Sequence, residues 1–273
     1  MAEETNDQAS NLLNRALETL DEWRHLPAYQ LERRVDIFFG LLLPDVLEAK
    51  FELQSNHMKV IPEFPLHKGL IVNCDDEDGE DHQSVKVDFA VFYPDPDDQC
   101  ADAQEKRVFL VELKSDNESI HKTQLERMKK AKDKGADTLL EGVINCARRS
   151  NSPRKYAHLI RRLDLLGCIE NFEGFEKGDW NKSQPGLAGR FRCMRVGTSW
   201  SDAKIELVLV YPGHKLTAGS SRVEQVLKDS SPWLERVDFS EVAELVDGSP
   251  LSRYLVKWAR CAAGTADPWR IAS

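Results

Sequence analysis

The stretch "FLVELKSD" (residues 109–116) places two charged side chains, Glu112 and Lys114, inside an otherwise apolar run. A short apolar run of this kind predicts a buried strand. Because side chains alternate along a strand, Glu112 and Lys114 face one side of the sheet and Leu113 faces the other. Isolated charges are costly to bury, so each of the two needs a partner. Glu112 and Lys114 therefore form one polar cluster on a buried face of the sheet.

A second strand is predicted just upstream, over "SVKVDFAVFYP" (residues 84–94), where two sets of side chains alternate between the faces. Asp88 interrupts the apolar character of this strand, as Glu112 does in the next one. The polar segment at residues 94–105 predicts the long turn of a hairpin that joins the two strands. In such a hairpin Asp88 can lie beside Glu112.

The rest of the chain predicts helices around these strands. A helix over residues 11–26 ends at Pro27, and a second begins near residue 28 and is closed or kinked by Pro44. The core stripe predicted for the second helix is Leu31, Val35, Phe38 and Leu42. Further helices are predicted after Asp116, with Asn117 or Ser119 as the N-cap and Gly135 as a break, over residues 138–149 and 152–167, and near residues 239–246 and 250–262.

Two more strands complete an α/β fold, in which a mixed β-sheet is flanked by helices. The segment "MKVIPEFPL" (residues 58–66) contains two prolines, which confine it to a sheet edge or a bulge. A regular strand is predicted over residues 203–212. We expect a single domain over residues 1–273, with a core at about 28–212 and a C-terminal helical extension at about 213–273.

The composition is that of an ordinary globular protein, and the sequence lacks the motifs of several enzyme classes. Of its 273 residues, 41% are hydrophobic and 30% are charged, and the longest apolar run is too short to span a bilayer. The acidic, polar N-terminus is unlike a signal peptide, so we expect a cytoplasmic protein without a membrane segment. The six cysteines form no C-x-x-C pair, and the sequence lacks the histidine spacings of zinc enzymes, phosphate-binding loops and the serine-hydrolase elbow.

The net charge of −9 conceals a basic segment at residues 121–163. This segment holds twelve Lys and Arg residues against four acidic ones, a local charge of +8 that leaves −17 for the rest of the chain. A basic face on an acidic protein is typical of nucleic-acid binding. A solvated helix face explains the same charges equally well.

Asp88 and Glu112 have the chemistry of hard oxygen ligands for Mg²⁺ or Mn²⁺. A bound ion orients and acidifies a water molecule and neutralises charge on a phosphate, and Lys114 would then position that water or stabilise the anionic transition state. The alternative is structural. In that case Lys114 neutralises Asp88 and Glu112 in a buried ion network.

These residues resemble the motif of the PD-(D/E)XK nuclease superfamily. Asp88 matches the acid of the first motif, although Val87 stands where the family often has a proline. The triplet from Glu112 to Lys114 matches E-x-K, and Gln124 matches a glutamine in the next helix. Glu32 is our choice for the upstream helix acid, because "LERRVDIFF" resembles the first-helix motif of the family. Asp36 and Glu48 are alternatives for that acid.

The resemblance covers roughly residues 28–165 and implies a restriction-endonuclease-like core with extra C-terminal helices. It implies a metal-dependent nuclease that hydrolyses phosphodiester bonds of nucleic acid, DNA in preference to RNA, held through residues 121–163. The implied catalytic residues are Glu32, Asp88, Glu112, Lys114 and Gln124, of which Asp88, Glu112 and Glu32 would bind Mg²⁺ or Mn²⁺. The alternative is a catalytically silent binding or scaffold protein of the same fold, and a homo-oligomer or a protein partner is also open.

Two further positions allow a functional or a structural interpretation. Glu63 can approach the active face of the sheet, or it can be a surface residue of an edge strand. Tyr156, together with Arg154, can contact a phosphate or stack on a base. Alternatively, Tyr156 is an aromatic side chain at the edge of the core.

Overall fold

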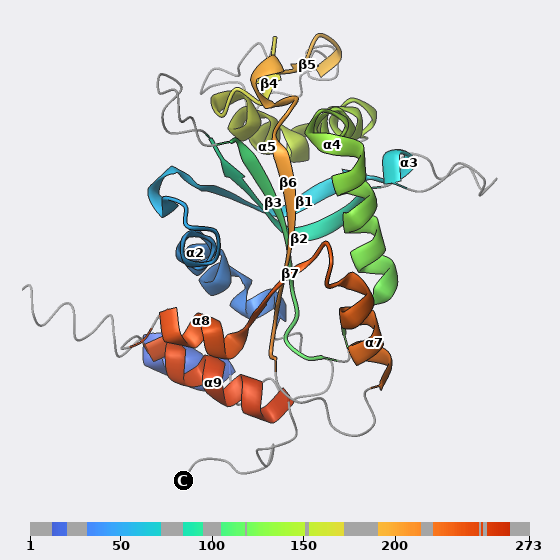
Figure 1. Ribbon diagram of the computed structural model, residues 1–273. Coiled ribbons are helices and arrows are strands. Elements are labelled where there is room, and N and C mark those ends of the chain that lie inside the picture. Colours follow the sequence, from blue (N-terminus) through green and yellow to red (C-terminus); the bar gives the residue numbers. More distant parts are fainter. Residues whose placement is uncertain are drawn as a thin grey trace, which may run out of the picture. The chain divides into compact units, whose positions relative to one another are not determined.

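Figure 1 shows the computed structural model of the chain. The described residues are 13–20, 32–71, 84–94, 105–117, 119–150, 153–171, 191–213, 221–245, 247 and 250–262. Residues 13–20 are helical, in agreement with the first predicted helix. The rest of that helix, Pro27 and most of the predicted hairpin turn lie outside the described residues.

Five strands of the described residues form one sheet, in the order β1-β2-β3-β6-β7. Their bounds are β1 Lys59–His67, β2 Ser84–Tyr93, β3 Arg107–Leu113, β6 Lys204–Tyr211 and β7 Glu235–Asp238. β1 and β2 are antiparallel whereas β6 and β7 are parallel, so the sheet is mixed. The predicted α/β class is confirmed, as are the neighbouring strands that carry Asp88 and Glu112.

Helices and short elements fill the intervals between these strands. The helices are α2 Glu32–Phe51, α3 Lys68–Ile71, α4 Lys122–Arg149, α5 Pro153–Leu165, α7 Ser221–Ser230, α8 Phe239–Leu245 and α9 Pro250–Ala262. Two single turns, η1 Ser55–His57 and η3 Thr198–Trp200, and a small sheet of β4 Ile169–Glu170 and β5 Arg195–Val196 complete the order. The helices predicted near residues 152–167, 239–246 and 250–262 are confirmed, whereas α7 and β7 were not predicted.

Helix α2 uses a different core stripe from the predicted one. Val35, Phe39, Leu43 and Leu47 are all buried, at 2% exposure or less. Phe38 and Leu42 are only half-buried, so their assignment to the stripe is wrong. Steps of four residues turn the buried face by about 40° at each step, so the observed stripe winds gradually around the helix.

Pro44 lies inside α2 and does not close it, because the helix continues to Phe51. A proline inside a helix removes one backbone hydrogen bond and costs about 3 kcal/mol. Buried side chains on both sides of Pro44, from Leu43 and Val46, supply packing that offsets this loss. Tertiary packing thus overrides the tendency of the proline to end the helix.

Gly135 breaks the regular geometry of α4, as predicted. Its backbone has φ 84° and ψ 167°, far from helical values. A Cβ at this position would meet nothing within 4 Å, so space does not require a glycine here. The backbone conformation does, because residues with a side chain rarely adopt it.

β1 is an edge strand of the sheet, as its prolines predicted. Its register with β2 is continuous from Lys59↔Phe92 to His67↔Ser84 except at Glu63, which stands opposite Asp88 without pairing. Glu63 has a positive φ of 52°, which an L residue adopts only at a cost in energy. The strand is therefore locally distorted at the position that faces Asp88.

Contacts divide the chain into two compact units, each assembled from separate segments. Unit 1 contains Met1–Asn56, Val111–Gln124 and Val208–Ser273, and unit 2 contains His57–Leu110 and Leu125–Leu207. In unit 1, α8 lies beside α9 (Figure 1) and contacts α2, where the tilted rings of Phe39 and Phe239 pack with centroids 5.3 Å apart. In unit 2, Phe92 and Trp200 meet edge to face at 5.4 Å. The single domain stays a prediction.

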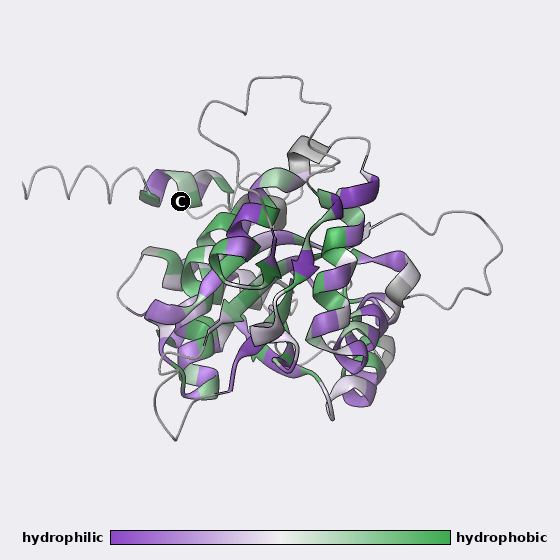
Figure 2. Ribbon diagram, turned by 90° about the horizontal axis from the view of Figure 1, so that it is seen from above, coloured by the Kyte–Doolittle hydropathy of each residue, from purple (hydrophilic) through white to green (hydrophobic). Residues whose placement is uncertain are grey.

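Polar and apolar residues alternate in bands along the helices (Figure 2). Within the described part of the chain, no helix combines the length and apolar character needed to cross a bilayer. Among the cysteines described there, Cys146, Cys168 and Cys193 are free. Burial raises the pKa of Cys146 to about 11, so this thiol stays protonated at neutral pH.

Candidate active site

Glu112 and Lys114 form an ion pair at the end of β3. The Nζ atom of Lys114 lies 2.6 Å from Oε1 of Glu112. Gln124, in α4, donates a hydrogen bond from Nε2 to the same carboxylate oxygen. The structure therefore brings together three of the five predicted catalytic residues.

The ion pair of this cluster is buried, and Gln124 is half-buried. Glu112 is 0% exposed and Lys114 is 6% exposed. Leu113, which lies between them in sequence, is also buried, as expected for a strand with both faces covered. A buried carboxylate needs charged or hydrogen-bonded neighbours to offset its desolvation, and Lys114 and Gln124 provide both. The Glu112 carboxylate is thereby fixed in orientation.

A tight turn between β3 and α4 brings Gln124 back to Glu112. The carboxylate of Asp116 accepts a hydrogen bond of 2.7 Å from the N–H of Ser119, and the Ser119 hydroxyl donates to the Asp116 carbonyl at 2.9 Å. Such side-chain contacts are typical of turns that begin with Asp. Helix α4 then begins at Lys122. Gln124 is consequently in its first turn.

Asn117 ties the same turn to the residues that follow β6. Its Nδ2 donates to the carbonyl of Gly213 at 3.3 Å. The N–H of Lys114 donates to the carbonyl of Val210 at 2.8 Å, which extends the pairing of β3 past its last residue. The prediction that Asn117 or Ser119 is the N-cap of the helix is wrong, because both residues belong to the turn that precedes it.

Asp88 lies on β2 and is half-buried. β2 and β3 are neighbours in the sheet order, which agrees with the predicted pair of strands. Asp88 belongs to unit 2, whereas Glu112, Lys114 and Gln124 belong to unit 1. The proximity of Asp88 to Glu112 stays a prediction.

The three candidates for the upstream acid are all on α2. Glu32 is the first residue of the helix, and its side chain lies outside the described residues. Asp36 is half-buried, and Glu48 is exposed. Among the side chains that the structure describes, no group of three or more His, Cys, Asp or Glu residues could hold a metal ion. Because Glu32 is not among them, the ligand set of Asp88, Glu112 and Glu32 stays a prediction.

The cations of the basic segment are divided between internal contacts and the surface. Three ion pairs hold Lys129 to Asp133 at 2.9 Å, Lys132 to Glu206 at 3.1 Å and Arg148 to Glu141 at 3.0 Å. Arg148 also donates to the carbonyls of Phe191 and Met194, so it supports a neighbouring segment of the chain. The exposed cations are Lys122, Lys130, Lys134, Arg149, Arg161 and Arg162, and the side chains of Arg154 and Lys155 lie outside the described residues.

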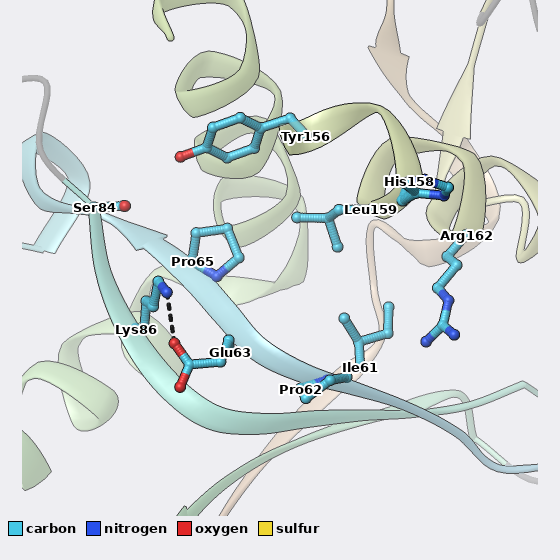
Figure 3. Close-up of a pocket in the computed structure, with 10 residues that line it drawn as sticks. All are labelled: Ile61, Pro62, Glu63, Pro65, Ser84, Lys86, Tyr156, His158, Leu159 and Arg162. Carbon is cyan, nitrogen blue, oxygen red and sulfur yellow. Dashed lines mark hydrogen bonds and ion pairs between the residues drawn. The ribbon is translucent and has the colours of Figure 1, made fainter. Parts of the chain in front are cut away.

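Glu63 and Tyr156, which the sequence left open, line one groove of unit 2 (Figure 3). Arg162 lines it as well, although the sequence presented it only as one cation of a basic segment. Leu159 is three residues from both Tyr156 and Arg162 on α5, so it is adjacent to each of them on the helix surface. This spacing is the feature of the sequence that could have predicted that Arg162 lines the groove.

Comparison with protein-family models, with curated proteins and with solved structures finds no match for this chain. The functional interpretation therefore depends on the residues and contacts described above.

Proposed function

We propose that the chain is a metal-dependent nuclease of the PD-(D/E)XK type, with a restriction-endonuclease-like core. It hydrolyses phosphodiester bonds of nucleic acid, DNA in preference to RNA. The observation that carries the proposal is the buried cluster in which Lys114 and Gln124 both donate to Oε1 of Glu112. Buried ion pairs bring little stability of their own, because desolvation consumes most of the Coulombic gain. A pair placed in the core therefore favours a chemical role.

Each residue of the cluster has a task in this reaction. Gln124 holds the Glu112 carboxylate in place, as outer residues do around metal ligands. Lys114 carries three N–H donors, so one can hold Glu112 while another stabilises the charge that develops on the phosphate. The water oxygen forms a bond to phosphorus and the water gives up one proton to the surrounding solvent, while the bond to the leaving sugar oxygen breaks and that oxygen takes up one proton.

The donor set fits a hard divalent cation. Asp88, Glu112 and Glu32 offer carboxylate oxygens, the ligands that Mg²⁺ and Mn²⁺ prefer, and these three residues would hold the ion. When bound, the ion supplies charge neutralisation at the phosphate and lowers the pKa of a water molecule. The burial of Glu112 keeps bulk solvent away from this oxygen donor.

One observation favours a second candidate, a catalytically silent binding or scaffold protein. Oε1 of Glu112 is already contacted by two donors from its own chain. These two contacts can offset the charge of the carboxylate without a metal ion. The divalent-metal dependence of any activity separates the two candidates.

Cleavage of labelled single- and double-stranded DNA and RNA tests the proposal, with Mg²⁺, Mn²⁺ or a chelator. The informative variant is Glu112→Gln, which preserves the shape and the hydrogen-bond acceptor while removing the charge. Lys50→Met is the control, because Lys50 pairs with Glu241 at 3.5 Å on the surface, outside the cluster.

We expect wild type and Lys50→Met to cut DNA only when a divalent metal is present, and Glu112→Gln to be inactive while remaining folded. A wild-type protein that is folded and binds metal but cuts none of the four polymers would support the silent scaffold. Cleavage that survives in the chelator would exclude the proposed chemistry.

A further inference from the structure

A groove of about 490 Å³ lies between strands β1 and β2 and helix α5. Figure 3 shows Tyr156, Leu159 and Arg162 projecting from α5 towards the strands, with Leu159 between Tyr156 and Ile61. The volume is within the range of small-ligand sites. All of its lining residues belong to unit 2.

The strand side of the groove carries a matched pair of charges. Nζ of Lys86 lies 2.5 Å from Oε2 of Glu63, and both side chains are more than half exposed. Glu63 holds its unusual positive φ at this point of the groove. Backbone strain of this kind is frequently found at ligand sites. The pair contributes no net charge.

The helix side supplies an aromatic ring and a further cation. Tyr156 is half-buried, with its ring lying along the groove in Figure 3. Arg162 is exposed, and its NH1 donates to the carbonyl of Val60 at 3.3 Å. This contact uses one of the five N–H groups of the guanidinium and holds it beside β1.

The groove also approaches the strand position of a candidate metal ligand. Lys86 and Asp88 are two residues apart on β2, so they project to the same face of the sheet. Glu63 stands opposite Asp88 in the register of β1 and β2. A ligand in the groove would therefore lie alongside the strand position of Asp88.

We propose that this groove binds one nucleotide of a single nucleic-acid strand, with the base against Tyr156 and the phosphate on Arg162. The inference rests on the proposed function for its choice of ligand class. The charges of Lys86 and Glu63 cancel, so Arg162 gives the lining of the groove a net charge of about +1. This charge matches the single negative charge of a phosphodiester. A free nucleoside triphosphate carries several more negative charges than this lining neutralises.

Base–aromatic stacking and a guanidinium at the backbone are the usual means of holding single strands. Glu63 adds an acceptor that an exocyclic amino group of a base can reach. Adenine- or cytosine-containing strands should consequently bind more tightly than thymine-only strands of the same length.

Binding of a labelled single-stranded oligonucleotide, measured by fluorescence anisotropy in a chelator, tests this site without any turnover. The variants are Tyr156→Ala, Tyr156→Phe and Arg162→Ala. Arg161→Ala is the matched control, because it removes an exposed charge from the same helix at a residue that does not line the groove. Thermal unfolding of each variant confirms that it is folded.

We expect Tyr156→Ala to weaken binding roughly 5- to 150-fold, the effect of losing one base–aromatic stack. Tyr156→Phe should bind like wild type, because the ring is retained. Arg162→Ala should weaken binding more than Arg161→Ala, which measures the general electrostatic contribution of one exposed cation of the basic segment. Free mononucleotides are the second arm of the experiment and should bind far more weakly than the strand.

Equal affinities of wild type, Tyr156→Ala and Arg162→Ala would overturn the inference, as would mononucleotides that bind as tightly as the strand. The two proposals fail separately. If the protein cuts nucleic acid only with metal while the Tyr156 and Arg162 variants bind the strand normally, the nuclease proposal would stand and the proposal of a binding groove would fail. If the strand binds only when Tyr156 is present and the protein never cuts, the proposal of a binding groove would stand and the nuclease proposal would fail.

Discussion

Lys114, the residue that follows β3, donates a hydrogen bond of 2.6 Å to Glu112, two residues before it in sequence, and both side chains are buried. Alternation along β3 places the pair on one face, and Gln124 completes it from the first turn of α4. Because the pair is buried, the cost of removing its charges from water decides how each partner affects stability. Removing one partner leaves a buried charge, whereas removing both does not.

The first prediction concerns the stability of this pair. Lys114→Met should lower the free energy of unfolding by about 3–5 kcal/mol, because the Glu112 charge stays buried without its cation. The double variant Glu112→Gln/Lys114→Met should recover much of that loss. Urea unfolding of the wild type and of the single and double variants measures the coupling.

Lys129→Met is the control for this cycle, because Lys129 pairs with Asp133 at 2.9 Å on the surface. It should change stability by less than about 1 kcal/mol. A double variant less stable than Lys114→Met would contradict the account of a costly buried charge.

The second prediction compares two glycines with similar backbone conformations. Gly213 has φ 76° and Gly167 has φ 69°. A Cβ at Gly213 would lie 2.4 Å from Cβ of Asp238, whereas a Cβ at Gly167 would come no closer than 3.7 Å to Ser199. Gly167→Ala should cost about 1–2 kcal/mol from conformation alone. Gly213→Ala should cost more, because the clash is added to it.

The clash has a further consequence for α8. Asp238 accepts hydrogen bonds from the N–H groups of Ser240 at 2.8 Å and Glu241 at 3.0 Å, while Glu241 accepts one from the N–H of Asp238 at 2.7 Å. This is a capping box, and losing it costs about 1 kcal/mol. Chemical denaturation of both alanine variants checks the order, and equal losses would show that Asp238 moves aside freely.

The third prediction concerns acid pH. Burial alone would raise the pKa of Glu206, but hydrogen bonds from Lys204 and Lys132 outweigh it and hold the pKa below its ordinary value of 4.5. A carboxyl with a lowered pKa stabilises the folded state above the unfolded pKa, and this stability is lost as the pH falls through the folded pKa. Wild type should therefore lose more stability than Glu206→Gln below pH 4.5.

Urea unfolding at about pH 6 and about pH 3 measures this difference. Identical losses of stability in the two proteins would show that the contacts of Glu206 with Lys204 and Lys132 contribute nothing to the acid sensitivity.

The fourth prediction concerns the divalent metal. A saturating concentration of Mn²⁺, about 100 times its Kd, should stabilise the folded protein by about 2.7 kcal/mol and raise Tm. The rise should disappear in Asp88→Ala. It should persist in Asp133→Ala, which removes a surface carboxylate that is paired with Lys129. An equal rise in both variants would remove Asp88 from the ligand set.

Short-range patterns predicted four of the five strands of the main sheet and the Glu112–Lys114 pair, because alternation along a strand depends only on neighbouring residues. Gly135 was predictable for the same reason, since its conformation is local. Long-range contacts were not predictable. The tie from Asn117 to Gly213 and the groove between Glu63 and Tyr156 join residues that are distant in sequence.

Errors arose where packing competes with a local signal. Pro44 predicted the end or a kink of a helix; the end is wrong, because the helix continues past it to Phe51 with buried side chains on both sides of the proline, and the kink stays a prediction. The stripe of α2 was assigned to Phe38 instead of Phe39, because both residues are aromatic and the sequence does not show which face meets the core. Each error concerns a choice that tertiary contacts make.

The most direct test of the central claim is the rate of DNA cleavage in Mn²⁺ by Lys114→Met, beside wild type and Lys50→Met, with each protein confirmed as folded. If Lys114 stabilises the charge on the phosphate, the rate should fall at least about 100-fold in Lys114→Met and stay unchanged in Lys50→Met. A Lys114→Met protein that cuts DNA at the wild-type rate would contradict the account and leave the Glu112–Lys114 pair a structural feature.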